Sequence, residues 1–246
     1  MLDLYKKIDE KKVKLDALRP LPPALVHNIE QWLRIDLTYN SNAIEGNTLS
    51  AAETALVVEK GLTIGGKTVK EHLEAINHTY ALDYIQDLAK EKRAIDNTDI
   101  KNIHRLILKG IDDQHAGGWR TINVKIAGSD VVLASPLSIQ DCMHDFQEWL
   151  KTNTDHPIKK AAEAHLQLVT IHPFVDGNGR TARLLMNLLL LQQGYPIAII
   201  KNKDRMAYIN ALEKAQKTGD DYDFIELICK AVDHTLDVWL DAVHKI

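Results

Sequence analysis

The chain has 246 residues, 45% hydrophobic and 26% charged, which is enough for one large domain or for one domain with a small appendage. Its net charge of −4 argues against a general nucleic-acid binder, because affinity for a phosphate backbone needs a basic surface. Only two cysteines are present, Cys142 and Cys229, which argues against a disulfide framework or a zinc site and fits a reducing cytoplasm.

The first predicted element is a short charged helix over residues 1–19, which ends before Pro20 because the residue preceding proline disfavours helix. The N-terminus lacks an apolar signal core, and the longest apolar run, residues 184–191, is too short to span a bilayer. A second helix opens at Pro22-Pro23 and is capped by Gly46. Its predicted core face holds Leu25, Ile29, Trp32, Leu33 and Leu37.

Glu45 is unusual at the end of that second helix. The helix dipole repels a carboxylate at the C-terminus, so Glu45 should have a cationic partner elsewhere in the chain. The alternative is a solvated glutamate, which is common at helix ends.

Residues 50–68 support two interpretations. Ser50 to Glu53 form a capping box that starts a helix ending at Gly61. The segment 61–68, GLTIGGKT, satisfies the P-loop pattern, but a P-loop needs a parallel sheet, which the rest of the chain does not indicate. Thr68 with Glu71 reads equally well as a second capping box.

Two further helices are predicted over residues 69–90 and 99–110, the latter after an Asn97-Thr98 cap. Their expected core positions are Leu73, Ile76, Tyr80, Tyr84 and Leu88, then Ile103, Leu106, Ile107 and Ile111. These helices carry His72, His78 and His104 without ligand spacing, which indicates surface or core roles rather than metal binding.

Residues 117–136 break the helical rhythm. Ile122, Val124 and Ile126 alternate at period two, residues 128–130 form a turn, and residues 131–133 return, which predicts a β-hairpin. A two-stranded hairpin is marginal alone, so it should lean on the helical body.

The next predicted helix, residues 139–152, contains His144-Asp145. A metal-dependent phosphohydrolase is one interpretation of such a pair, but nothing in the sequence marks the further histidines and aspartate which that chemistry needs. Pro157 then opens a helix that carries His165 on one face.

The stretch 171–183, IHPFVDGNGRTAR, concentrates the chemistry of the chain. A Gly-Asn-Gly turn entering a helix forms an anion cradle from the first backbone N–H groups. Arg180 and Arg183 share a helix face there, and two cations beside a positive helix end call for a polyanion such as a phosphate chain. Asp176 suits Mg²⁺, and His172 suits a general base near neutral pH.

The order of these residues resembles the signature of the Fic-domain family, H-P-F-x-[DE]-G-N-G-R-x-x-R, with every fixed position matched. The resemblance implies transfer of AMP from ATP to a protein hydroxyl, with His172 as the base and Asp176 as the Mg²⁺ ligand. It also implies that Gly177, Asn178 and Gly179 bind phosphate oxygens, as do Arg180 and Arg183. The Doc-type branch phosphorylates instead and has lysine in place of Gly179, so adenylyl transfer is favoured. Without the family, the stretch could be a helix connector with solvated arginines.

Three other segments gain a role from the same resemblance. Residues 41–46, SNAIEG, resemble the inhibitory motif [ST]-x-x-x-E-[GN], in which Glu45 would pair with Arg183 and disturb the γ-phosphate of ATP. The hairpin resembles the family flap, whose edge (Val124, Lys125, Ile126 and Ala127) would hold the target by strand addition and cover the nucleotide. After a turn at 194–196, a helix from Asp204 resembles the segment over the adenosine, where Tyr208, Ile209 and Gln216 would line the pocket. Asparagine is frequent near Gln216 in the family, and a core role is the alternative for Tyr208.

The sequence therefore predicts an all-α fold of about nine helices with one hairpin, the last helix being 221–244. Residues 1–95 would carry the inhibitory motif, and residues 96–246 would form the Fic core. The predicted function is a cytoplasmic, Mg²⁺-dependent protein adenylyltransferase with ATP as substrate and a target protein on the flap. Neither nucleic acid nor a membrane is an expected partner, and self-association is a further expectation from the resemblance. Two alternatives remain: removal of AMP at the same site, with Glu45 positioning water, and a nucleotide-sensing or protein-binding module with vestigial chemistry.

Overall fold

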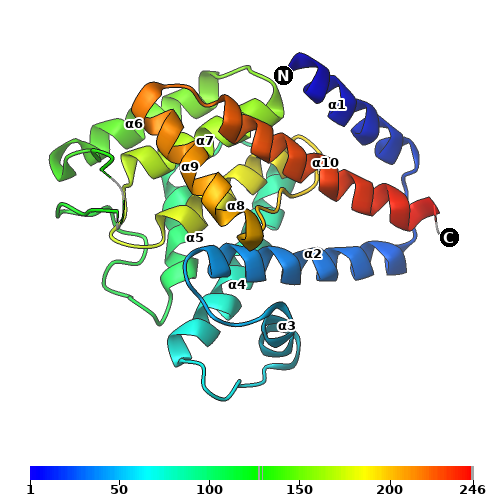
Figure 1. Cartoon of the computed structure of the whole chain (residues 1–246), viewed down its shortest axis with the longest axis horizontal. Coiled ribbons are helices and arrows are strands. Elements are labelled where there is room, and N and C mark those ends of the chain that lie inside the picture. The colour runs from blue at the N-terminus through cyan, green and yellow to red at the C-terminus, as the bar shows by residue number, and fades with distance from the viewer. Residues whose placement is uncertain (127, 129, 245–246) are drawn as a thin grey trace.

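The computed structural model describes residues 1–126, 128 and 130–244. Ten α-helices and two short 3₁₀ helices make up its regular structure, and none of the described residues lies in a strand (Figure 1). The predicted all-helical fold is confirmed, with ten helices where the sequence predicted about nine. The helices are α1 (Leu2–Ala17), α2 (Pro23–Ile44), α3 (Ala51–Lys60), α4 (Val69–Glu91), α5 (Asn97–Leu108), η1 (Pro136–Ser138), α6 (Ile139–Thr152), α7 (Pro157–Ile171), α8 (Asn178–Gln192), η2 (Asn202–Asp204), α9 (Arg205–Thr218) and α10 (Tyr222–His244).

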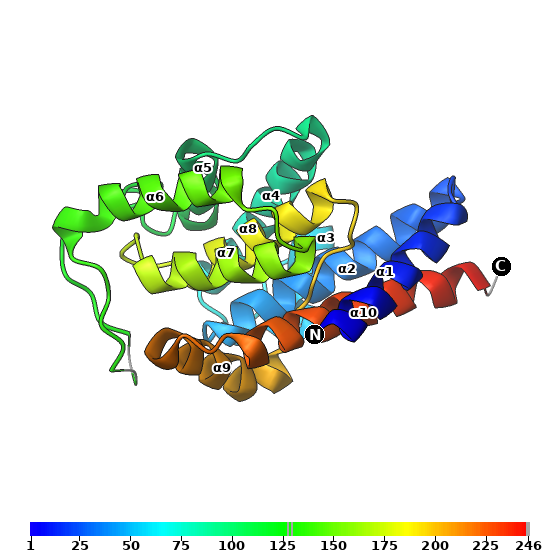
Figure 2. The same cartoon turned by 90° about the horizontal axis from the view of Figure 1, so that it is seen from above.

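Helix α8 is the centre of the molecule. Its side chains from Arg180 to Leu190 are buried, and the run from Leu184 to Leu190 is apolar except for Asn187, as expected of a helix enclosed by the core. Helices α4, α5 and α7 pack around it (Figures 1 and 2). The polar Asn187 is accommodated because its amide exchanges two hydrogen bonds with the backbone of Ala198, at 2.7 and 3.1 Å. The packing of α4, α5 and α7 around α8 therefore determines where the start of α8 lies.

Helices α2, α3 and α4 form the N-terminal layer beside α8. The capping boxes predicted at Ser50 with Glu53 and at Thr68 with Glu71 are both present, and α3 ends at Gly61 in the left-handed conformation. Because a helix, not a strand, precedes residues 61–68, the P-loop interpretation of that segment is wrong.

Three local predictions are wrong. Trp32 and Tyr80, placed on core faces by periodicity, are exposed. On α4 the buried face instead includes the polar Asn77 and His78. The spacing of apolar residues therefore predicted the wrong rotation of this helix against the core. Helix α5 starts at Asn97 and is capped by Asp96, whose carboxylate accepts the N–H groups of residues 98 and 99.

The segment 117–136, predicted as a hairpin, leaves the helical body and returns to it (Figure 2). Its described residues, which exclude Ala127 and Ser129, carry no strand assignment. We call this segment the excursion. Two of its apolar side chains are strongly exposed, Val132 at 92% and Ile122 at 55%, and the other described ones from Val124 to Ala134 are half-buried. An extended pair with so little burial lacks the third strand or apolar cover that would stabilise a sheet.

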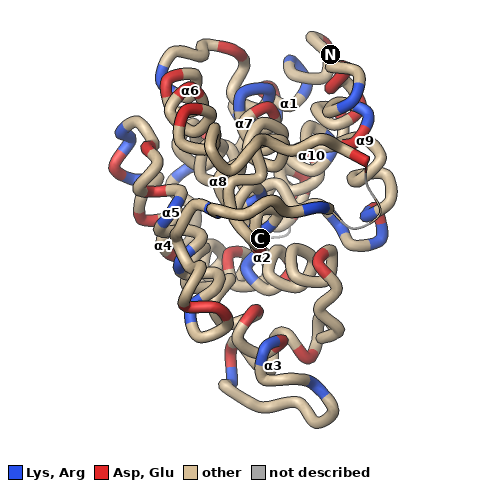
Figure 3. Tube along the Cα trace, turned by 90° about the vertical axis from the view of Figure 1, so that its left-hand side faces the viewer, with Lys and Arg blue, Asp and Glu red and all other residues tan. Residues whose placement is uncertain are grey.

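Acidic and basic residues are interspersed along the chain in Figure 3, so that view shows no face of a single sign. Within the described ranges, no helix combines the length and apolar character needed to cross a membrane.

Candidate active site

The turn between α7 and α8 is held by backbone geometry and by Asn178. His172 ends α7 with φ +53°, and Gly177 precedes α8 with φ +77°, so both ends of the turn are left-handed. The Asn178 side chain accepts the N–H of Phe174 and donates to its carbonyl, both at 2.9 Å. A side chain at Gly177 would crowd the His104 ring at 3.3 Å, which adds to the conformational preference for glycine at this positive φ.

His104 of α5 is hydrogen-bonded to the backbone of this turn and of residue 117. Its Nδ1 accepts the Gly117 N–H at 2.8 Å, which leaves Nε2 to donate to the Asp176 carbonyl at 2.9 Å. Its ring stacks on Phe174 with centroids 3.6 Å apart. Burial lowers the pKa of His104 to about 4, so the imidazole is neutral at pH 7. Of the surface or core roles expected for this histidine, the structure shows the core one, and nothing in the sequence indicated its link to the central turn.

His172 has a tautomer that is set by its backbone contact. Since a carbonyl can only accept, the 3.2 Å contact with the Val169 carbonyl places the proton on Nδ1 and the lone pair on Nε2. Burial lowers the pKa of His172, while the hydrogen bond to Val169 opposes that effect. The ring is therefore neutral near pH 7, the state in which it can take a proton.

Asp176 projects its carboxylate at the surface beside the start of α8, with 55% of its side chain exposed. One oxygen accepts the Gly177 N–H at 2.7 Å, and the other lies 3.5 Å from Arg180. Among the described residues, no three His, Cys, Asp or Glu side chains gather as a metal site. A single exposed carboxylate nevertheless fits Mg²⁺ that arrives with a phosphate chain, because this ion is usually bound by one or two carboxylates plus substrate oxygens.

Arg180 is buried and ion-paired. Its Nη1 donates to Glu74 of α4 at 3.1 Å, and Glu74 also accepts from Asn47 at 2.9 Å. The solvated-face interpretation of the motif arginines is therefore wrong. The anion that Arg180 requires is supplied by the protein itself.

Arg183 is also buried and contacts the end of α2. Its guanidinium donates to the Ser41 hydroxyl at 3.0 Å, to the Ser41 carbonyl at 2.8 Å and to Glu45 at 2.8 Å. It also donates to the Tyr208 hydroxyl at 3.3 Å. Burial alone would lower the pKa of Arg183, but Glu45 and Tyr208 raise it above the ordinary value. Arg183 is thus the cationic partner that the position of Glu45 called for.

Glu45 lies directly over the start of α8. A Cβ on Gly179 would stand only 2.4 Å from Glu45 Oε1 and 3.1 Å from Arg183 Nη1. The carboxylate therefore occupies the anion-binding end of the helix, next to the backbone that was predicted to hold phosphate oxygens. With 39% of its side chain exposed, Glu45 is not locked in place by burial.

Helix α9 contributes the predicted pocket residues from two faces. Tyr208 is buried, and its hydroxyl also bonds to His165 Nε2 at 3.0 Å. Ile209 is partly exposed, on the face from which Arg205 donates to the Ile44 carbonyl at 2.8 Å. Gln216 on that face donates to Thr170 at 3.2 Å. This face of α9 therefore borders the ends of both α2 and α7, where Glu45 and His172 lie.

The excursion reaches the turn through Arg120, which sequence reasoning did not single out. Its Nε donates to the His172 carbonyl at 2.7 Å. Val124, Lys125 and Ile126 are partly or fully exposed, and Ala127 lies outside the described residues.

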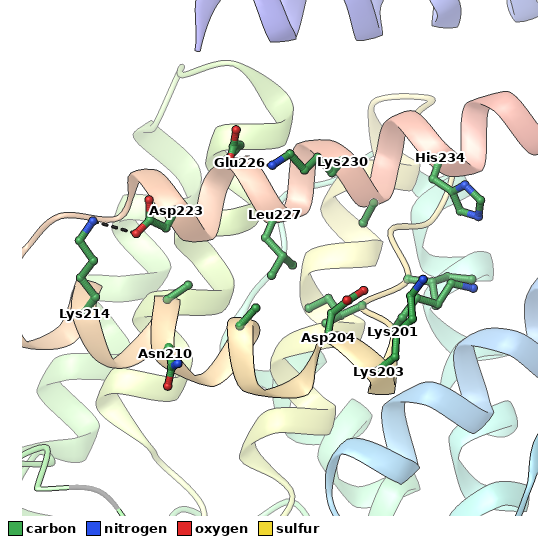
Figure 4. A pocket seen from close by; sticks show the side chains of 15 residues that line it. Lys201, Lys203, Asp204, Asn210, Lys214, Asp223, Glu226, Leu227, Lys230 and His234 are labelled. Carbon is green, nitrogen blue, oxygen red and sulfur yellow. Dashed lines mark hydrogen bonds and ion pairs between the residues drawn. The ribbon is translucent and has the colours of Figure 1, made fainter.

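A cavity of about 690 Å³ lies elsewhere, between α9 and α10 (Figure 4). It is lined by Ala207, Asn210 and Lys214 of α9 and by Leu227, Lys230 and His234 of α10, among others. These α9 residues face away from Arg205 and Gln216, so this cavity is separate from the turn. The His144-Asp145 pair is exposed on α6, and no metal-binding cluster includes it within the described residues, so nothing supports the phosphohydrolase interpretation.

The fold and the site define an all-helical protein with a histidine-bearing turn and a helix start at which the Glu45 carboxylate lies. Comparisons with known proteins all point to one family. The Fic/DOC family pattern matches residues 94–190. A protein adenylyltransferase Fic of Nematostella vectensis is 37% identical over 97% of this chain and 56% of its own length. The solved Fic-1 (residues 134–508) of C. elegans has TM-score 0.87 and 32% identity, over 98% of this chain and 71% of that one.

A Fic domain-containing signaling protein of Bacteroides thetaiotaomicron aligns with TM-score 0.89 and 27% identity, over 98% of this chain and 97% of that one. This chain belongs to the Fic family. It spans about half the length of the curated relatives it matches.

Proposed function

We propose that this protein transfers AMP from ATP to a Ser, Thr or Tyr hydroxyl of a target protein. The observation that carries the proposal is the start of α8, where a carboxylate already sits against Gly179 and Arg183. A site that accepts the carboxylate of Glu45 is suited to a phosphate oxygen, since both are anions that accept from N–H donors. The name of the relatives, protein adenylyltransferase Fic, supports the same reaction.

In the proposed mechanism, Nε2 of His172 takes the proton from the target hydroxyl. The resulting oxygen attacks the α-phosphorus of ATP, and pyrophosphate leaves. The N–H groups of residues 177–179 and the guanidiniums of Arg180 and Arg183 hold the phosphate oxygens in place. Mg²⁺ on Asp176 would neutralise phosphate charge when bound. Rate enhancement would come mainly from positioning and charge neutralisation.

We further propose separate roles for different segments of the chain. Residues 96–246 would form the catalytic core, and residues 1–95 would carry the inhibitory motif at 41–46. Val124, Lys125, Ile126 and Ala127 would hold the target as a flap, consistent with the exposed apolar side chains of the excursion. On α9, Tyr208, Ile209 and Gln216 would line the adenosine pocket. Self-association stays a prediction from the family resemblance.

Glu45 is the proposed inhibitor. To seat its phosphates, ATP must compete with a carboxylate that is already hydrogen-bonded to Arg183 at 2.8 Å. The wild-type enzyme is therefore expected to be slow, and Glu45→Gly is expected to be faster by about tenfold or more, because a hydrogen bond to a charged group contributes about 1.5–3 kcal/mol.

The test is incubation with α-labelled ATP and a protein lysate. Glu45→Gly should increase labelling, and adding His172→Ala to it should abolish labelling. Glu91→Gly is a matched control, because Glu91 is also an exposed glutamate at a helix end but lies on α4 away from the turn. Equal rates for wild type and Glu45→Gly would refute the inhibitory role, and label retained without His172 would refute the mechanism.

A second candidate reaction is removal of AMP from a modified target. The observation that favours it is the partly exposed Glu45 carboxylate at the start of α8, which could orient a water molecule toward a bound phosphate. Supplying a pre-modified target and measuring released AMP separates the two reactions. In that case Glu45→Gly would slow the release of AMP.

A further inference from the structure

Arg120 is buried at the base of the excursion, with only 2% of its surface exposed. Its guanidinium donates to three carbonyls from three places in the chain: His172 at 2.7 Å, Ile122 at 2.9 Å and Ala134 at 2.5 Å. Its own backbone N–H donates to the Pro173 carbonyl at 2.8 Å. One side chain thus joins both legs of the excursion to the turn that carries the proposed base.

This arrangement depends on the shape of arginine. The planar guanidinium presents its donors in a fixed fork, whereas a lysine ammonium is a single point that cannot reach three separated carbonyls in the same way. Among the described residues, Arg120 has no carboxylate partner, and burial lowers its pKa. A buried cation held only by carbonyl groups is costly unless its geometry is well satisfied, so the three contacts define its position.

His172 needs such support. Its φ of +53° lies in the left-handed region, which is unfavourable for a residue with a side chain. Its imidazole is anchored through Val169, and its carbonyl is anchored through Arg120. Movement of the Ile122 or Ala134 carbonyls would therefore act on the His172 backbone through a single rigid group.

We propose that Arg120 is a positioning residue that couples the conformation of the excursion to the placement of His172. A polypeptide that binds the excursion would thereby align the base, and an incorrectly placed excursion would misalign it. The role of His172 as a base rests on the proposed function, but the physical link between the two segments does not.

Hydrogen exchange tests that link directly on the 246-residue chain without ligand. The Arg120 amide is bonded to the Pro173 carbonyl and reports on the contact between the excursion and the turn, whereas the His172 and Phe174 amides report on the turn. In Arg120→Met, all three should exchange faster by about tenfold or more, because charge-assisted bonds to these segments are lost. The Ala198 amide, bonded to Asn187 in the core, should keep its wild-type rate.

Arg120→Lys, which keeps the charge and most of the stem, should show a smaller increase confined to the same amides. Faster exchange at Arg120 with an unchanged rate at His172 would overturn the coupling. Equal acceleration at Ala198 in both variants would also overturn it, because Arg120 would then stabilise the fold in general.

Kinetics in the Glu45→Gly background provide the second readout. With α-labelled ATP and lysate, Arg120→Met should reduce the maximal labelling rate about tenfold or more and leave the apparent KM for ATP within about twofold, since Arg120 does not contact residues 177–183. Arg93→Met is the control, because Arg93 is bound to Asp99 at the start of α5 and contacts neither segment. A raised KM for ATP with an unchanged maximal rate would contradict the proposal. No labelling even with Arg120 intact would refute the proposed function, whereas the exchange measurements would still decide the link.

Discussion

The buried pair between Glu74 and Arg180 leads to a quantitative prediction. Glu74→Gln removes the negative charge from α4 but keeps a side chain of the same size. Arg180 Nη1 then loses its carboxylate partner at 3.1 Å, whereas Nη2 keeps the Asp176 carboxylate at 3.5 Å. The new amide also presents an N–H group toward Asn47, which at present donates to Glu74.

Both charged side chains are shielded, with 3% of Arg180 and 10% of Glu74 exposed. Breaking a buried ion pair by removing one partner costs about 3–5 kcal/mol. We take the lower end, about 3 kcal/mol, because Asp176 still offers some compensation. At about 2–4 °C per kcal/mol for a chain of this length, the melting temperature should fall by about 6–12 °C.

The same substitution should make ATP a better stabiliser. In the variant, Arg180 has lost the Glu74 carboxylate. A bound triphosphate could then form an ion pair with Arg180 without first displacing that carboxylate. If affinity rises tenfold, the stabilisation by saturating ATP increases by about 1.4 kcal/mol, or about 3–6 °C in melting temperature. Thermal melts with and without ATP and Mg²⁺ measure both quantities.

The control is Asp87→Asn on the same helix. Asp87 and Lys90 form an exposed pair, so its loss should leave stability nearly unchanged. A fall of less than about 2 °C for Glu74→Gln would refute the energetic reasoning. An ATP-induced shift no larger than in wild type would refute the idea that Glu74 and phosphate serve the same guanidinium.

Other predictions concern the two histidines of the site. His172→Ala should abolish AMP transfer and leave ATP affinity by calorimetry within about twofold, since the backbone donors and arginines remain; a large loss of affinity would contradict a role confined to proton transfer. Because burial lowers the pKa of His172, the transfer rate should be level from pH 7 to 8 and fall only below pH 6.5, and a midpoint above 7 would contradict this. Burial lowers the pKa of His104 to about 4, so between about pH 4 and 6.5 the unfolded chain binds more protons than the folded one. The free energy of unfolding should therefore rise with pH across that window, more steeply in wild type than in His104→Gln, as urea titrations at each pH would show.

Local features of the fold could be predicted from the sequence because their causes lie within a few residues. The capping boxes at Ser50 and Thr68 depend on a glutamate three positions later, and both are present. The anion-binding turn depends on glycines and arginines within one stretch, which also carried the family resemblance. Trp32 was misplaced because periodicity reports which residues are apolar, not how a helix is rotated against its neighbours.

The supports of the site could not be predicted, for a different reason. Arg120 and His104 bind backbone carbonyls 52 and 72 residues away, and a carbonyl group leaves no mark in an amino-acid sequence. Glu74 lies 106 residues from Arg180 on a helix with many charged residues, so nothing distinguishes it from a solvated glutamate. Such partners become visible only when the chain is folded.

The two motif arginines explain why an N-terminal layer belongs to this site. The N-terminal end of a helix carries partial positive charge, which repels the two buried guanidiniums. Anions must therefore lie beside them in the folded protein even without a nucleotide. Helix α4 supplies one through Glu74, and α2 supplies the other through Glu45. Under the proposed function, each of these carboxylates would also compete with phosphate for its arginine. Glu74 is shielded, whereas Glu45 at the end of α2 is 39% exposed, so under the proposed function Glu45 is the carboxylate that phosphate would displace more easily.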